Sequence, residues 1–129
     1  MIASRSFSTI ARAATLAMAV LAALPATAAE LLMLEQAGCA WCARFNKEIA
    51  PIYAKTEEGR LAPLRRVDIH APWPDDLAGI LPERFTPTFV LVEDGREIGR
   101  MRGYAGDEFF WVLLQELLEK LPQAGQNSG

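Results

Sequence analysis

The spacing of hydrophobic residues predicts four β-strands between residues 31 and 101. Residues 88–92 are consecutive β-branched, aromatic or aliphatic residues and form the strongest strand signal. The Asp94-Gly95 pair that follows is typical of a two-residue hairpin turn, so the chain is expected to return as a strand. The predicted strands are 31–34, 64–69, 88–92 and 96–101.

Apolar residues three and four positions apart predict three helices between and after these strands. The last of them carries the clearest pattern, and its apolar face, Phe109 included, is expected to lie in the core. The order of elements is therefore β-α-β-α-β-β-α, which indicates an α/β domain with a four-stranded mixed sheet flanked by helices. The predicted helices run from Cys39 to Glu57-Glu58-Gly59 with a kink at Pro51, from an Asp75 or Asp76 cap to Leu81, and from an Asp107 cap to Pro122.

The first 28 residues have a different composition from the rest. Arg5 and Arg12 are their only charged residues, residues 13–24 are uncharged and mostly apolar, and Ala26-Thr27-Ala28 has small side chains. This three-part pattern is typical of a cleaved secretory signal peptide, and the apolar run is too short to span a bilayer. We therefore expect export to an oxidising compartment. The expected organisation is a signal peptide at 1–28, a folded domain at 29–122 and a disordered tail at 123–129.

Composition excludes several functional classes. The chain has 129 residues and a net charge of −3, which argues against a nucleic-acid partner. Its two cysteines are too few for a disulfide-rich scaffold, and its one histidine is too few for a histidine-rich metal site. We expect one small domain that works as a monomer.

The chemistry of the chain centres on Cys39-Ala40-Trp41-Cys42, which lies where the first predicted strand ends and a helix begins. Free backbone N–H groups at a helix N-terminus stabilise an anion, so Cys39 is expected to be a reactive thiolate and nucleophile. Cys42 lies one helical turn further on and can resolve a mixed disulfide formed by Cys39.

Three other interpretations of this cysteine pair remain open. A structural disulfide across so short a loop contributes only about 2 kcal/mol on the chain-entropy model. A four-cysteine zinc site needs a second cysteine pair, which the chain lacks. Two thiolates could instead hold Cu(I), as in a metallochaperone. The strand, helix and export signal around the pair favour redox chemistry, with no bound metal or cofactor beyond the Cys39–Cys42 disulfide itself.

Thr86-Pro87 at the start of the third strand is a candidate substrate-binding element. Proline cannot donate to a strand ladder and therefore belongs at the beginning or edge of a strand. We predict that the Thr86–Pro87 peptide bond is cis, which would direct the Thr86 backbone toward the dithiol. Thr86 and Pro87 could then pair with an extended substrate chain.

Three further segments near the dithiol are candidates for a role in the site. Glu35 ends the strand before Cys39 and could accept or deliver the proton of Cys42, or it could be a solvated strand-end acid. Ala40 and Trp41 are expected to shape the surface that contacts substrate. His70, after the second strand, is interpreted as structural.

The Cys39-Ala40-Trp41-Cys42 motif, followed about 45 residues later by Thr86-Pro87-Thr88-Phe89, resembles the thioredoxin superfamily over nearly all of the predicted domain. The resemblance implies the thioredoxin fold and thiol–disulfide oxidoreductase activity. Leu34-Glu35-Gln36 and Gly103-Tyr104 are similar to the SoxS-like periplasmic thioredoxins of bacterial sulfur-oxidation (Sox) clusters. The chain departs from cytoplasmic thioredoxins at Gly38, where they have tryptophan, and at Met33, where they have a buried aspartate.

This narrower resemblance implies a function in the periplasm. The protein would keep the thiols of the substrate-carrying protein of the Sox pathway reduced, and a membrane electron donor of the CcdA/DsbD type would recharge its dithiol. Alternatives are a thioredoxin of cytochrome c maturation, a disulfide isomerase, a Cu(I) metallochaperone using the same dithiol, and a non-catalytic interaction module that uses the groove around Pro87.

Overall fold

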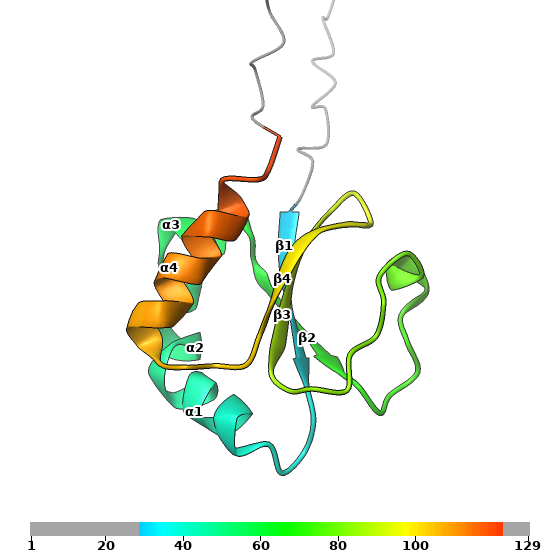
Figure 1. Cartoon of the computed structure of the whole chain (residues 1–129), viewed down its shortest axis with the longest axis horizontal. Helices are drawn as coiled ribbons and strands as arrows, with labels where there is room; N and C mark the ends of the chain where they lie inside the picture. Colours follow the sequence, from blue (N-terminus) through cyan, green and yellow to red (C-terminus); the bar gives the residue numbers. More distant parts are fainter. Residues whose placement is uncertain (1–28, 123–129) are drawn as a thin grey trace, which may run out of the picture.

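The computed structural model describes residues 29–122, shown in colour in Figure 1. The predicted signal peptide at 1–28 and the predicted tail at 123–129 lie outside the described residues. Within the described part, no helix is long and apolar enough to cross a membrane. The elements are β1 (Ala29–Glu35), α1 (Ala40–Glu48), α2 (Ala50–Tyr53), α3 (Glu57–Leu61), β2 (Leu64–Asp68), the 3-10 helix η1 (Asp75–Leu77), β3 (Thr88–Glu93), β4 (Arg96–Arg102) and α4 (Asp107–Leu118).

All four predicted strands are present and form one mixed sheet in the order β2-β1-β3-β4. β1 pairs in parallel with β2, and the other two pairings are antiparallel. The parallel pair requires a crossover, which α1, α2 and α3 supply (Figure 1). The most apolar strands, β1 and β3, occupy the centre, where both of their faces are buried.

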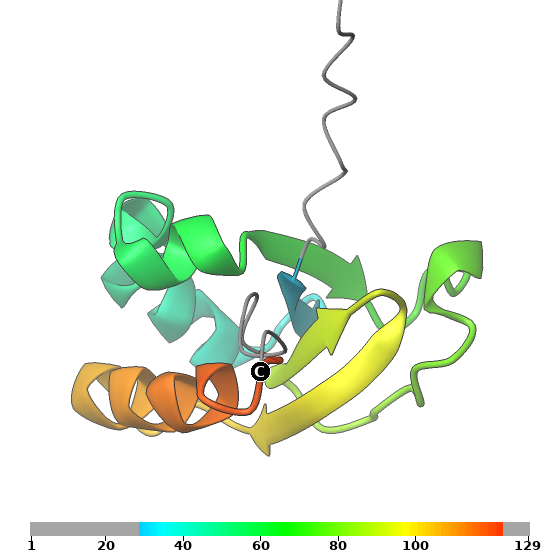
Figure 2. The same cartoon turned by 90° about the horizontal axis from the view of Figure 1, so that it is seen from above.

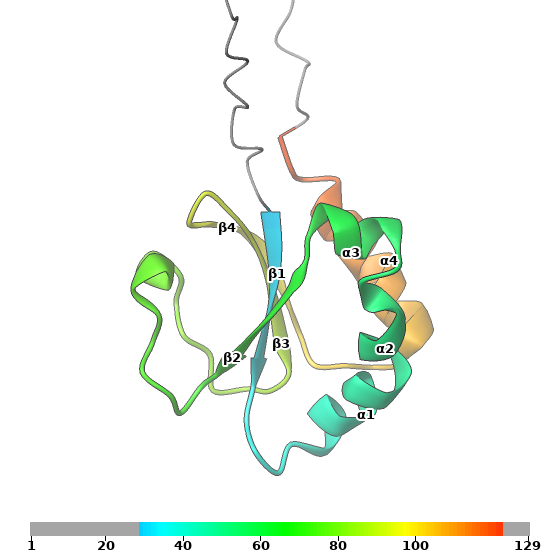
Figure 3. The ribbon, with the colours of Figure 1, turned by 180° about the vertical axis from the view of Figure 1, so that it is seen from behind.

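The helices cover one face of this sheet, as Figures 2 and 3 show from two further directions. The core on this side is built around Phe45 of α1, which is fully buried. Its ring centroid lies 4.7 Å from that of Phe89, 5.2 Å from that of Phe110 and 5.7 Å from that of Tyr104. Because these rings come from α1, β3, α4 and the segment before α4, this aromatic cluster joins the helices to the sheet.

The opposite face is covered by the long connection between β2 and β3 rather than by a regular helix. The predicted helix reaching Leu81 is wrong, because only η1 forms, over three residues. Gly79 disfavours helix, and Pro82 restricts the residue before it, so the turn cannot extend. Leu77 nevertheless packs against the sheet, and the Trp73 indole N–H donates to its carbonyl at 2.8 Å.

The predicted first helix is divided into three. Pro51 lacks an N–H and stands in the first turn of α2, where no donor is needed. The expectation that Glu57-Glu58-Gly59 ends the helix is wrong, since Thr56 starts a new helix there by accepting the Gly59 N–H at 3.0 Å. A Cβ on Gly59 would lie 1.8 Å from the Tyr53 carbonyl oxygen, so only glycine fits at this position.

The last helix begins one residue differently from the prediction, and only part of its apolar face is buried. Gly106, with φ of 116°, is the N-cap, and Asp107 is the first helical residue instead of the cap. Phe110 and Leu114 are buried, whereas Phe109 is 63% exposed. The expectation that Phe109 is a core residue is therefore wrong: the helix turns Phe110 inward and leaves Phe109 on the neighbouring face.

Candidate redox site

The two cysteines form a disulfide at the N-terminus of α1, with their Cα atoms 5.2 Å apart. Cys39 is the N-cap of the helix and is partly exposed, whereas Cys42 is only 4% exposed. The backbone N–H of Cys42 donates to Cys39 Sγ at 3.1 Å. An incoming sulfur can therefore reach Cys39 more easily than Cys42, and a thiolate at Cys39 would keep a hydrogen-bond donor directed at it.

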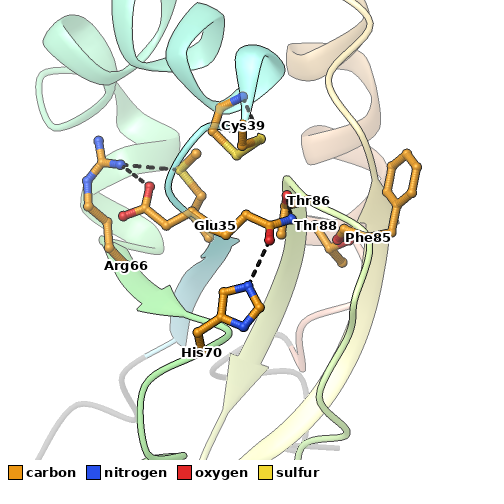
Figure 4. The surroundings of a disulfide bond; sticks show 10 residues. Glu35, Cys39, Arg66, His70, Phe85, Thr86 and Thr88 are labelled. Atoms are coloured by element: carbon orange, nitrogen blue, oxygen red, sulfur yellow. Dashed lines mark hydrogen bonds and ion pairs between the residues drawn. A yellow bond between two sulfur atoms is a disulfide. The ribbon is translucent and has the colours of Figure 1, made fainter.

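Glu35 shares a pocket of about 520 Å³ with the disulfide. Its carboxylate accepts a hydrogen bond from Arg66 Nη1 at 2.7 Å, and the same nitrogen lies 3.5 Å from Met33 Sδ (Figure 4). Arg66 is the register partner of Met33 and reaches to Glu35 two residues further on. Glu35 is therefore two residues closer to the disulfide along β1 than Met33, on the same face of the strand. The pocket is lined by Glu35, Gln36, Ala37, Gly38, Cys39, Ala40, Cys42, Ala43, Asn46 and Asp68.

A second hollow, mainly apolar and about 330 Å³ in volume, lies beside Trp41; we call it the aromatic groove. Trp41 and Phe85 are 53% and 56% exposed, although both are large apolar side chains that normally favour burial. Of the residues expected to contact substrate, Trp41 and Thr86 line this groove, and Ala40 lines the pocket of Glu35. The aromatic groove is lined by Trp41, Phe85, Thr86, Arg102, Gly103, Tyr104 and Ala105.

The Thr86–Pro87 bond is cis, and the segment around it is held by hydrogen bonds from distant residues. Pro87 is buried, and its carbonyl accepts the Gly103 N–H at 2.7 Å. Gln36 Nε2 donates to Thr86 Oγ1 at 2.8 Å, and Gln36 Oε1 lies 2.8 Å from His70 Nε2 (Figure 4). His70 therefore lies beside the amide that donates to Thr86, and its structural role stays a prediction.

The loop that carries Phe85 is attached to β4 through Glu83. Its carboxylate accepts from Arg102 Nε at 2.7 Å and lies 3.7 Å from Arg100 Nη1. The hydrogen bond from Arg102 is the main reason that the pKa of Glu83 lies below its ordinary value. Glu83 thus links the loop that carries Phe85 to Arg102, and both of these residues line the aromatic groove.

Sequence reasoning missed five residues of this groove as site residues: Phe85, Arg102, Gly103, Tyr104 and Ala105. They lie more than 40 positions after the cysteines, and the pairing of β3 with β1 and β4 brings them next to Trp41. A local signal existed only for Tyr104, whose Gly103-Tyr104 pair stands out before the last helix.

Comparison with known proteins gives consistent results. A family described as a thioredoxin-like domain matches residues 17–118. The chain is similar to the reduced form of the periplasmic thioredoxin SoxS from Paracoccus pantotrophus, with 48% sequence identity and a TM-score of 0.68 over 71% of this chain and 97% of that chain.

A more distant likeness is to a thioredoxin of Malassezia sympodialis, Mala s 13, with 20% identity and a TM-score of 0.52. It covers 70% of this chain and 77% of the other, and at this identity it shows the fold alone. A search of curated protein sequences found no match.

Proposed function

This chain belongs to the thioredoxin-like family and is a thiol–disulfide oxidoreductase related to SoxS, and we propose that it works as a periplasmic reductase of protein disulfides. The predicted family, the predicted thioredoxin fold and the predicted enzyme class are confirmed. The observation that carries the proposed exchange mechanism is the asymmetry of the dithiol: Cys39 is partly exposed and Cys42 is buried. The likeness to SoxS supports the direction of the reaction as a reductase.

The proposed reaction begins with the reduced dithiol. The Cys39 thiolate attacks one sulfur of a substrate disulfide, whose S–S bond breaks, and the released substrate thiolate takes up a proton. Cys42 then loses its proton and attacks Cys39 Sγ, which releases the second substrate thiol and closes the Cys39–Cys42 disulfide. Two electrons pass to the substrate, and no bound cofactor or metal is needed.

We propose that the carboxylate of Glu35 accepts the proton that Cys42 loses in this step. Glu35 lines the same pocket as Cys42, and a hydrogen bond from Arg66 at 2.7 Å fixes the position of its carboxylate. Thr86 and Pro87 are proposed to hold the substrate chain, because Thr86 lines the aromatic groove and Pro87 fixes the backbone behind it. Ala40 and Trp41 would complete the contact surface.

The partners follow from the family resemblance. We propose that the substrate is the carrier protein of the Sox pathway, whose thiols must stay reduced, and that a membrane electron donor of the CcdA/DsbD type reduces Cys39–Cys42 again. The 48% identity to a periplasmic SoxS thioredoxin supports this assignment. We propose that the protein acts as a monomer.

The reduction potential of the dithiol tests the direction of electron flow. Equilibration of the protein with defined dithiothreitol buffers should give a value close to the thioredoxin value of about −270 mV. A value close to that of the oxidant DsbA, about −120 mV, would contradict a reductase and favour disulfide formation. A Cys42→Ser variant, which cannot close the disulfide, provides the blank for this titration.

Export can be tested by the mass of the mature protein. β1 begins at Ala29, so cleavage after Ala28 keeps the whole strand and cleavage after Ala29 removes only its first residue. Intact-mass analysis of periplasmic extract should find a chain that starts at Ala29 or Glu30. Leu21→Arg, which places a charge in the apolar run, should leave full-length protein in the cytosol. Full-length wild-type protein found only in the cytosol would refute export.

A further inference from the structure

One carboxylate links the two sides of the aromatic groove. Glu48, in the last turn of α1, accepts a hydrogen bond from Arg44 Nε at 2.8 Å and another from the Tyr104 hydroxyl at 2.5 Å. Arg44 lies one turn earlier on the same helix, but Tyr104 is 56 residues away in sequence. The hydrogen bond from Tyr104 is the largest cause, and that from Arg44 the next, of a Glu48 pKa below its ordinary value. The carboxylate is therefore ionised at neutral pH.

The guanidinium that Glu48 holds lies against two aromatic rings. Arg44 Cζ is 5.7 Å from the centre of the Trp41 ring and 5.9 Å from the centre of the Tyr104 ring. Both distances are within the range of cation–π attraction. Trp41 and Tyr104 both line the aromatic groove, and Trp41 is also the residue between the two cysteines.

We propose that Glu48 is a positioning residue that sets the affinity of the aromatic groove for extended polypeptide substrates. It acts through Arg44 on Trp41 and directly on Tyr104, so that both rings are held in place before substrate arrives. This inference rests on the proposed function, because it assumes that a protein chain lies in the groove during disulfide exchange.

Preorganisation explains why such an arrangement affects binding more than chemistry. Large side chains that are already fixed lose less conformational freedom when a partner binds. Trp41 is 53% exposed, and the guanidinium of Arg44 lies over its ring. The reacting sulfurs do not touch Glu48, so a disulfide too small to fill the groove should not depend on it.

The experiment compares Glu48→Gln with wild-type protein in the reduction of insulin by dithiothreitol. Glutamine keeps the size of the side chain but removes the charge that fixes Arg44. We expect KM for insulin to rise about 3- to 10-fold with little change in kcat, on the scale of one weakened hydrogen-bond pair. The rate with hydroxyethyl disulfide, which is uncharged and small, should be unchanged. Glu116→Gln, on the exposed side of α4, is the matched control and should match wild type.

A double-mutant comparison separates positioning from general loosening of the fold. In a Trp41→Ala background, Glu48→Gln should raise KM much less than it does in wild type, because one of the two rings it positions is gone. Tyr104→Phe, which removes only the hydroxyl, should raise KM for insulin in the same direction and covers the case in which Glu48→Gln folds poorly.

Three results would overturn the inference. These are an unchanged KM in Glu48→Gln, an equal loss of rate with insulin and hydroxyethyl disulfide, and a full additional effect in the Trp41→Ala background. Wild-type protein that reduces neither insulin nor hydroxyethyl disulfide would instead contradict the proposed function itself.

Discussion

Cys42→Ser should accumulate mixed disulfides with protein substrates through Cys39, and its turnover should fall on the order of 100-fold or more. Cys39 is the accessible sulfur at the helix N-terminus and still attacks, but the buried thiol that releases the substrate is gone. Non-reducing electrophoresis followed by intact-mass analysis should find adducts that dithiothreitol removes.

Cys39→Ser is the matched control for this trap. It should lose turnover to the same extent and yet form few adducts, since the remaining thiol of Cys42 is only 4% exposed. Equal amounts of adduct from the two variants would show that the two cysteines do not have the different roles assigned to them.

Phe45→Ala should produce the largest loss of stability of any single substitution considered for this protein. Phe45 is fully buried, and three aromatic rings surround it. Replacing a buried phenylalanine by alanine costs about 3–5 kcal/mol, which is a large part of the roughly 5–15 kcal/mol that stabilises a domain. Urea unfolding followed by circular dichroism measures the change in the free energy of unfolding.

Phe109→Ala supplies the comparison for Phe45, because it removes the same side chain from an exposed position of α4. Its effect should stay within about 0.5 kcal/mol, as for most surface substitutions. A loss as large as that of Phe45→Ala would mean that Phe109 is buried and that the orientation of α4 differs from the one described.

The strands could be predicted from the sequence more completely than the helices, for a physical reason. A strand is recognised from the residues it contains, and Thr88–Glu93 is unambiguous on that basis. Helix ends depend on single capping contacts, such as that of Thr56 to Gly59, and on residues that interrupt a turn. The buried face of α4 depends on how the helix docks on the sheet, and this leaves Phe109 exposed although the apolar pattern of α4 includes it.

The redox centre could be predicted because its two cysteines and the preceding strand are contiguous in sequence. The walls of the aromatic groove could not be, since Phe85 and Arg102 reach Trp41 only when β3 pairs with both β1 and β4. Glu48 has no distinguishing neighbour in the sequence except Arg44 four residues earlier, which reads as an ordinary surface ion pair. Its contact with Tyr104 requires the folded chain.

The strand order also bears on the solubility of the folded protein. Backbone groups along the outer strands of an open sheet can pair with another chain, and charged side chains on those strands oppose such aggregation. Here the outer strands carry the arginines, with Arg65 and Arg66 on β2 and three more on β4, while the apolar β1 and β3 are enclosed between them. Aggregation should therefore begin from unfolded chains, in which these two segments are uncovered, and not from native molecules meeting edge to edge.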